Sequence, residues 1–308
     1  MPVSLKELAT RQDRLATGHR LCPGCAEPII VRMVLNSIPG PVVIANATGC
    51  LEVSSTPYPF TSWQVPWIHN AFENAASTIS GVEAAYKALA RQGKTKGEQP
   101  TFLVFGGDGA TYDIGLQWIS GAAERGHRFV YVCLNNEAYM NTGIQRSGAT
   151  PTGAWTTTSP VGSAMSGKRE WRKDMTAIMV AHNMPYVAQG AIHAWRDLTT
   201  KIEKAVAAQG PTFINVLSPC PLGWRTESDL AVTLSRLALD TCLWPLYEVD
   251  HGQWRLTQMP RAKLPVAEWI KPQGRFAHLL RPGQEAVVQA IQTQVDADWE
   301  ALQKRCGV

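Results

Sequence analysis

Short apolar runs alternate with amphipathic segments along most of the chain, and each run ends in small or polar residues. The predicted strands cover 42–47, 101–105, 129–134, 186–189 and 212–217. The predicted helices cover 26–38, 72–92, 174–182, 194–209, 230–242 and 283–305. Strands that alternate with helices in this way are typical of a doubly wound, mostly parallel α/β sheet.

The remaining segments lack a clear period. Residues 51–71 and 137–170 are expected to be ordered loops, and the first is apolar enough to form a pocket wall or to lie under another subunit. Residues 1–21 predict a polar helical lead-in, and 247–257 predict a hairpin. The rest of 244–282 predicts an extended arm.

Composition excludes several function classes. The 308 residues are 45% hydrophobic and 18% charged, and the net charge of +4 includes no long basic run, so nucleic acid is not expected as a partner. No apolar stretch approaches the ~20 residues of a membrane span, and the first residues lack a signal core. We therefore expect a cytoplasmic protein, whose seven cysteines serve metal or redox chemistry rather than disulfides.

Polar side chains follow two neighbouring strands of the predicted sheet. Asp108 lies in Gly106-Gly107-Asp108-Gly109 after the first strand, and Asn136 follows the second. Parallel strands bring such turns to one edge, the usual ligand site of these folds. A carboxylate, an amide oxygen and a loop carbonyl are suitable ligands for a Mg²⁺ ion that also binds a diphosphate. The glycines would let the backbone approach that diphosphate, and a helix beginning near Tyr112 would point its N-terminus at it. A lone Gly-Asp-Gly is equally a plain turn, but the pair resembles the thiamine diphosphate signature.

Four cysteines occupy turns or predicted strand ends: Cys22, Cys25, Cys50 and Cys220. Cys133 is predicted to be a buried apolar residue, and Cys242 and Cys306 have no partner spacing. Four thiolates can hold Zn²⁺ or a [4Fe-4S] cluster, and the spacing alone also allows no metal. A neighbouring thiamine cofactor favours the cluster, because it supplies electrons that a one-electron acceptor can take.

Several motifs together resemble the beta subunit of pyruvate:ferredoxin oxidoreductase and related 2-oxoacid oxidoreductases. They are Cys22-Pro-Gly-Cys25, Ala47-Thr-Gly-Cys50-Leu-Glu, Ser55-Thr-Pro-Tyr-Pro, Gly106-Gly-Asp-Gly109, Asn135-Asn-Glu-Ala-Tyr-Met-Asn-Thr-Gly143, Ala149-Thr-Pro-Thr-Gly-Ala-Trp-Thr-Thr-Thr158 and Ser218-Pro-Cys220. The match runs from Cys22 to Cys220, and the tail at 244–249 looks similar too.

The resemblance implies a role for each matched residue. A [4Fe-4S] cluster would be held by Cys22, Cys25, Cys50 and Cys220. Mg²⁺ would be held by Asp108, Asn136 and the carbonyl of Ala138. The diphosphate would lie along Gly107 and Gly109, and the rest of the cofactor site would include Thr48, Gly49 and Cys50. Asn141 would lie beside the reacting centre, and Cys50 would be the cluster ligand nearest to it. Residues 1–225 would form this domain, and 226–308 would pack on it or on a partner subunit.

The implied activity is the oxidative decarboxylation of a 2-oxoacid, with pyruvate first. Electrons would pass through the cluster to ferredoxin, and the acyl group to coenzyme A. Candidates for the activating glutamate are Glu52, Glu73, Glu83 and Glu137, but the family places it on another chain. Alpha subunits and gamma or delta subunits are therefore expected as partners. Alternative substrates are oxalate, branched-chain 2-oxoacids and 2-oxoglutarate. A different class of function is a zinc-stabilised binding subunit without redox activity.

Overall fold

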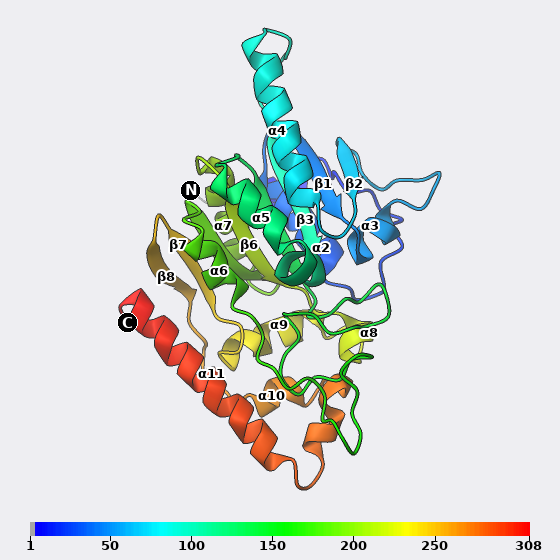
Figure 1. Cartoon of the computed structure of the whole chain (residues 1–308), viewed down its shortest axis with the longest axis vertical. Coiled ribbons are helices and arrows are strands. Elements are labelled where there is room, and N and C mark those ends of the chain that lie inside the picture. The colour runs from blue at the N-terminus through cyan, green and yellow to red at the C-terminus, as the bar shows by residue number, and fades with distance from the viewer. Residues whose placement is uncertain (1–3) are drawn as a thin grey trace.

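An eight-stranded sheet runs through the molecule in the order β2-β1-β3-β4-β6-β5-β7-β8 (Figure 1). This computed structural model describes residues 4–308. The strands are β1 (Val42–Ala47), β2 (Trp67–Asn70), β3 (Thr101–Gly107), β4 (Val130–Asn135), β5 (Tyr186–Ala191), β6 (Thr212–Leu217), β7 (Leu246–Asp250) and β8 (Gln253–Gln258). The first six strands in this order, from β2 to β5, pair in parallel. The β7–β8 hairpin adds two antiparallel strands next to β5. The predicted mostly parallel α/β sheet is confirmed.

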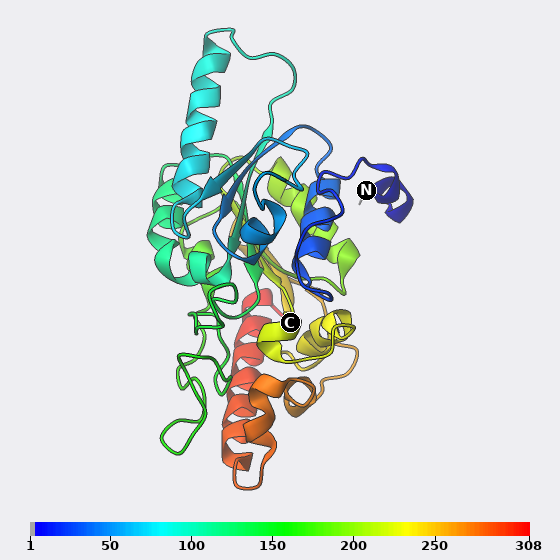
Figure 2. The ribbon, with the colours of Figure 1, turned by 90° about the vertical axis from the view of Figure 1, so that its right-hand side faces the viewer.

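Helices cover both faces of the sheet. They are α1 (Leu5–Thr10), α2 (Glu27–Ser37), α3 (Cys50–Ser55), α4 (Ala75–Arg91), α5 (Leu116–Glu124), α6 (Met175–Ala181), α7 (Trp195–Ala207), α8 (Pro221–Trp224), α9 (Ala231–Asp240), α10 (Ala267–Ile270) and α11 (Glu285–Cys306). A π-helical turn, η1 (Gly109–Ile114), and a 3-10 helix, η2 (Gly274–Leu280), complete the chain. Helices α2 and α7 lie on one face, and α4, α5 and α6 lie on the other (Figure 2).

The two helical layers explain why the strands are continuously apolar. On β3, Leu103 and Phe105 pack in the core that contains α2 and α7, while Phe102 and Val104 pack against the opposite layer. A strand that is buried on both faces needs apolar residues at every position. This pattern locates β1 and β6 to the residue from sequence alone.

The C-terminal segment builds a third core beside the sheet. Helices α9, α10 and α11 and the β7–β8 hairpin enclose the fully buried Trp224, Trp244 and Trp269. The hairpin is confirmed, but the rest of 244–282 is not an extended arm, since it contains α10 and η2. The division of the chain at residue 225 stays a prediction.

Two other predictions are wrong in part. Residues 51–71 were predicted to be a loop, but they contain most of α3 and the edge strand β2. Strand β2 has only four residues, two of them exposed, so its sequence shows no alternation of apolar and polar positions. The lead-in is helical only over α1, and residues 1–3 of that prediction lie outside the described residues. The predicted loop at 137–170 has no helix or strand, only isolated bridges.

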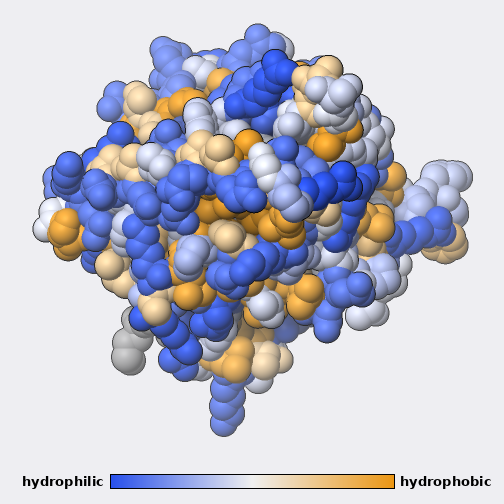
Figure 3. Space-filling model, turned by 90° about the horizontal axis from the view of Figure 1, so that it is seen from below, coloured by the Kyte–Doolittle hydropathy of each residue, from blue (hydrophilic) through white to orange (hydrophobic). Residues whose placement is uncertain are grey.

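The molecular surface is mixed in character. Figure 3 shows the face that is lowest in Figure 1, where apolar residues form small spots among hydrophilic ones. Within residues 4–308, none of the helices combines the length and the apolar character that a membrane crossing requires.

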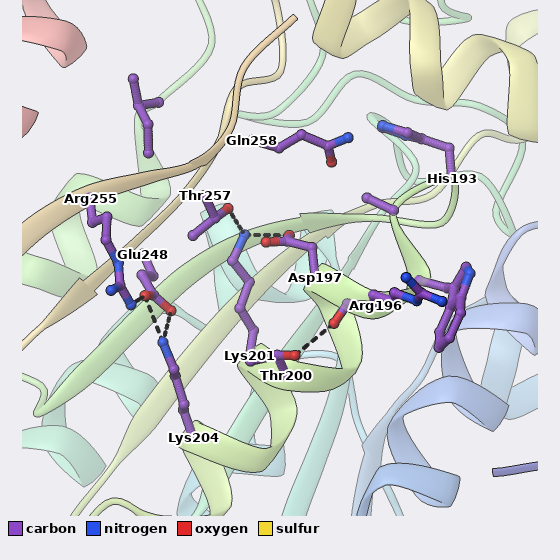
Figure 4. A pocket seen from close by; sticks show the side chains of 13 residues that line it. His193, Arg196, Asp197, Thr200, Lys201, Lys204, Glu248, Arg255, Thr257 and Gln258 are labelled. Carbon is purple, nitrogen blue, oxygen red and sulfur yellow. Dashed lines mark hydrogen bonds and ion pairs between the residues drawn. The ribbon is translucent and has the colours of Figure 1, made fainter. Parts of the chain in front are cut away.

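A buried carboxylate ties the hairpin to α7. Lys204 Nζ donates to both oxygens of Glu248, at 2.7 and 2.9 Å, and Tyr186 Oη donates at 2.6 Å. Arg255 also donates to Glu248. Nearby, Lys201 lies between Asp197 and Thr257, so both lysines that line the hollow in Figure 4 already have partners. We assign it a structural role.

The hydrogen bonds to Glu248 predict that the free energy of unfolding depends on pH. Burial opposes ionisation of Glu248, but hydrogen bonds from Lys204, Tyr186 and Arg255 outweigh it and lower its pKa from 4.5 to about 2. A lowered carboxyl pKa stabilises the fold above pH 4.5, and this contribution is lost as the pH falls from 4.5 toward 2. Glu248→Gln should lower the free energy of unfolding by about 1 to 3 kcal/mol at pH 7.

Urea unfolding at several pH values checks this. The difference between wild type and Glu248→Gln should shrink below pH 4.5. Glu268→Gln is the control, because its ion pair with Lys271 is exposed and should contribute little. Parallel pH curves for wild type and Glu248→Gln would contradict the assignment.

Candidate functional site

The ends of β3 and β4 form the centre of the site. The two strands pair in parallel, with Gly107 opposite Leu134, so the residues that follow them emerge at the same edge. Asp108 comes directly after β3 and is fully buried, and Asn136 comes directly after β4 and is 5% exposed. The predicted placement of both turns at one sheet edge is confirmed.

Each of these side chains keeps one oxygen without a partner. Ser147 Oγ donates to Asp108 Oδ2 at 2.5 Å, and Asn136 Nδ2 donates to Glu27 Oε1 at 3.0 Å. Asp108 Oδ1 and Asn136 Oδ1 are buried and accept no hydrogen bond from the described residues. Burial raises the pKa of Asp108 to about 8 despite the bond from Ser147. A hard cation would satisfy both oxygens and favour the carboxylate, so the donor set fits Mg²⁺.

The glycines of the first turn have separate roles. A Cβ on Gly106 would lie 2.3 Å from Tyr131 Oη, and a Cβ on Gly109 would lie 2.2 Å from the ring of Tyr139. Only Gly107 faces open space. Gly107 therefore leaves space that a ligand could occupy, whereas the other two glycines make room for tyrosines. The helical segment begins at Gly109 as the π-helical turn η1, earlier than the predicted start near Tyr112.

One cavity connects nearly all the predicted cofactor residues. It is lined by Thr48, Gly49, Cys50, Gly107, Gly109, Asn136, Ala138 and Asn141, together with Glu27 and other side chains. Asp108 is not among the lining residues and is fully buried. Asn141 is exposed and lines the cavity.

The four predicted cysteine ligands come from three turns near this cavity. Cys25 N donates to Cys22 O at 3.0 Å, which closes the Pro-Gly turn, and Ala26 N donates to Pro219 O at 3.4 Å, which joins that turn to Cys220. Cys50 begins α3 and lines the cavity. All seven cysteines of the chain are free.

The thiols are close enough to influence one another electrostatically. Burial raises the pKa of Cys50 and of Cys25, and both are raised further by Glu27 and by the other thiols. Burial also raises the pKa of Cys220 to about 11. Thiolates at these positions therefore require a cationic group nearby. Among residues 4–308, no three His, Cys, Asp or Glu side chains surround a single metal-ion position.

None of the four candidate glutamates lines the cavity. Glu83 pairs with Lys87 and His127, and Glu137 pairs with Arg275. Glu27, which the sequence analysis missed, does line it, and its Oε2 is buried without a hydrogen bond. Burial raises the pKa of Glu27 to about 7, against the bond from Asn136. Its position two residues after Cys25 was the only available signal.

Comparison with known proteins gives a consistent picture. Residues 47–216 match the family model described as the thiamine pyrophosphate enzyme C-terminal, TPP-binding domain. Among solved structures, a 2-oxoglutarate:ferredoxin oxidoreductase from Magnetococcus marinus superposes with a TM-score of 0.56 at 20% identity, covering 73% of this chain and 79% of that chain. This likeness supports the fold.

Curated relatives extend over nearly the whole chain. Pyruvate synthase subunit PorB of Thermotoga maritima is 49% identical, over 98% of this chain and 96% of the relative. The same-named subunit of Methanocaldococcus jannaschii is also 49% identical, over 95% and 97%. Ketoisovalerate oxidoreductase subunit VorB of Pyrococcus furiosus is 37% identical, over 100% and 99%.

Proposed function

Since the chain belongs to the family of beta subunits of thiamine diphosphate-dependent 2-oxoacid:ferredoxin oxidoreductases, we propose that its own substrate is pyruvate. In the proposed reaction pyruvate loses CO2, its acetyl group passes to coenzyme A, and the two electrons released reduce ferredoxin. The observation that carries the choice is the identity of 49% to pyruvate synthase subunits, compared with 37% to a ketoisovalerate subunit.

The site residues fit the diphosphate end of the cofactor. Asp108, Asn136 and the Ala138 carbonyl would hold Mg²⁺, with the two unpartnered buried oxygens as the supporting observation. Gly107 and Gly109 would lie along the diphosphate. Bound thiamine diphosphate would supply the carbanion that attacks the 2-oxo carbon and the ring that takes up electrons when CO2 leaves.

The chain's own part in this chemistry is to bind and orient. Ser147 holds Asp108 from behind, and Glu27 holds the amide of Asn136, so that the free oxygens of both remain available to the metal. Burial excludes water from this end of the site. Thr48, Gly49 and Asn141 also line the cavity, where Asn141 would hydrogen-bond the reacting centre.

Cys22, Cys25, Cys50 and Cys220 would hold a [4Fe-4S] cluster. Their placement beside the cavity supports this, because Cys50 lines the cavity itself and would form the shortest electron path.

A partner subunit would complete the site. The activating glutamate is proposed to come from an alpha subunit, because the four candidates in this chain lie off the cavity and Glu27, which lines it, is already bonded to Asn136. Next to α3, the side chains of Tyr58 and Phe60 are 98% and 69% exposed, which suits a surface covered by that subunit. Gamma or delta subunits and ferredoxin would complete the assembly, in the cytoplasm, where thiols stay reduced.

A panel of oxoacids tests the substrate. The purified complex, with all copurifying subunits, is assayed for oxoacid-dependent reduction of ferredoxin with coenzyme A present. Pyruvate should give a kcat/KM at least about tenfold above 2-oxoisovalerate, 2-oxoglutarate or oxalate, since one or two methylenes in a fitted pocket change binding by 1–3 kcal/mol. A preference for 2-oxoisovalerate would favour the second candidate, the VorB-like activity, and oxalate turnover without coenzyme A would contradict both.

Asn136→Ala tests the magnesium site. It removes one oxygen ligand and should weaken the binding of Mg²⁺ with thiamine diphosphate by at least about 100-fold, because the loss of an outer-shell partner alone costs up to about 100-fold. Calorimetric titration of the cofactor-depleted complex measures this. Asn36→Ala, on α2 and away from the cavity, is the control and should bind normally. Unchanged binding by Asn136→Ala would refute the assignment.

Gly24→Ala tests the cluster. Gly24 and Gly18 both have positive φ, +79° and +90°, so alanine strains the backbone at both. Only at Gly24 would the new Cβ also lie 2.0 Å from Ser228 O, which must distort the turn that carries Cys22 and Cys25. Gly24→Ala should lose most of its iron and sulfide and the low-temperature EPR signal of the reduced complex, while Gly18→Ala keeps them. Zinc without iron in the wild type would contradict the cluster.

A further inference from the structure

A buried ion pair connects the C-terminal segment to the turn after β4. Arg275 Nη2 donates to Glu137 Oε2 at 2.6 Å, and the two side chains are 2% and 0% exposed. Glu137 stands between Asn136 and Ala138, the two positions proposed to bind Mg²⁺, while Arg275 lies on η2. The segment that matches the family model ends at residue 216, so Arg275 acts from outside it.

The turn has a backbone that needs support. Glu137 has a φ of +69°, in the left-handed region that side chains other than glycine rarely adopt. Its N–H donates to Asn135 Oδ1 at 3.1 Å, and its carbonyl accepts from Thr150 Oγ1 at 2.6 Å. These bonds fix the peptide groups, and the pair with Arg275 fixes the side chain.

Arg275 is itself held firmly. Its Nε and Nη2 donate to Gln273 Oε1 at 2.9 and 2.7 Å, and its guanidinium lies 4.1 Å from the centre of the Trp224 ring. Trp224 Nε1 in turn donates to the carbonyl of Asn136 at 2.8 Å. Trp224 and Arg275 therefore hold the turn at two successive residues, Asn136 and Glu137.

We propose that Arg275 is a positioning residue for the metal site: through Glu137 it fixes the turn so that the Asn136 oxygen and the Ala138 carbonyl face the cavity. The inference rests on the proposed function, which supplies the metal. Arg275 itself does not line the cavity and would not touch the cofactor.

A purely structural role would predict a different response. Loss of Arg275 alone leaves a buried carboxylate with only the longer contact from Arg172, at 3.5 Å, and such a charge destabilises a fold. Loss of both Arg275 and Glu137 leaves no buried unpaired carboxylate, and Arg172, whose side chain is 27% exposed, loses only its 3.5 Å contact, so stability can recover. If the pair positions the turn, however, the metal affinity stays low even when stability recovers. This difference separates a positioning role from a purely structural one.

The experiment uses the copurified complex after removal of Mg²⁺ and thiamine diphosphate. Arg275→Met, Arg275→Lys, the double variant Arg275→Met with Glu137→Met, and Leu302→Ala are compared with wild type. Leu302→Ala loosens the same C-terminal core without contact with the turn. Binding of Mn²⁺ in place of Mg²⁺, with thiamine diphosphate present, is followed by EPR, and thermal stability is measured in parallel.

Arg275→Met should weaken Mn²⁺ binding about 10- to 100-fold, and Arg275→Lys should restore part of the affinity. The double variant should regain thermal stability while its Mn²⁺ affinity stays low, and Leu302→Ala should lose stability but keep its affinity. Normal Mn²⁺ binding by Arg275→Met, or full recovery in the double variant, would overturn the inference while Asn136→Ala still fails to bind. Normal binding by Asn136→Ala as well would instead overturn the proposed metal site.

Discussion

Parallel pairing of β3 with β4 is the constraint on which the site depends. It places two turns at one edge of a sheet that is covered on both faces, so the side chains that follow the strands are buried as they emerge. A buried acceptor without a partner costs free energy, and this fold accepts that cost at one oxygen of Asp108 and one of Asn136. The neighbouring residues satisfy the other atoms of these side chains and leave those two available.

The charge balance of the site follows from the same burial. Asp108, Glu27 and the three partly buried thiols are all groups that become negative on ionisation, and burial opposes that change in each. Cations bound here would reverse the balance, because they favour the ionised forms. Binding of a cation and folding of this edge would therefore be linked, because burial disfavours the ionised forms of these groups and a cation favours them.

The sequence predicted most of the sheet, because a strand buried on both faces leaves an unbroken apolar run, as β1 and β6 show. It failed at α3 and β2, which are too short for their period to be read. At the site, the local motifs around Asp108 and Asn136 were visible, but Glu27 looked like the ordinary first turn of a helix. The pairing of Glu137 with Arg275, 138 positions apart, leaves no local pattern at all.

The ion pair between Arg275 in the C-terminal segment and Glu137 in the turn after β4 has an evolutionary consequence. Recombination that exchanged the C-terminal segment between relatives would separate an arginine from the carboxylate that it neutralises, and the hybrid would carry an unmatched charge in its interior. Viable hybrids would need to inherit both partners from one parent or lose both together. The tail and the sheet edge should therefore change in step as such chains diverge, although more than one hundred residues separate them along the polypeptide.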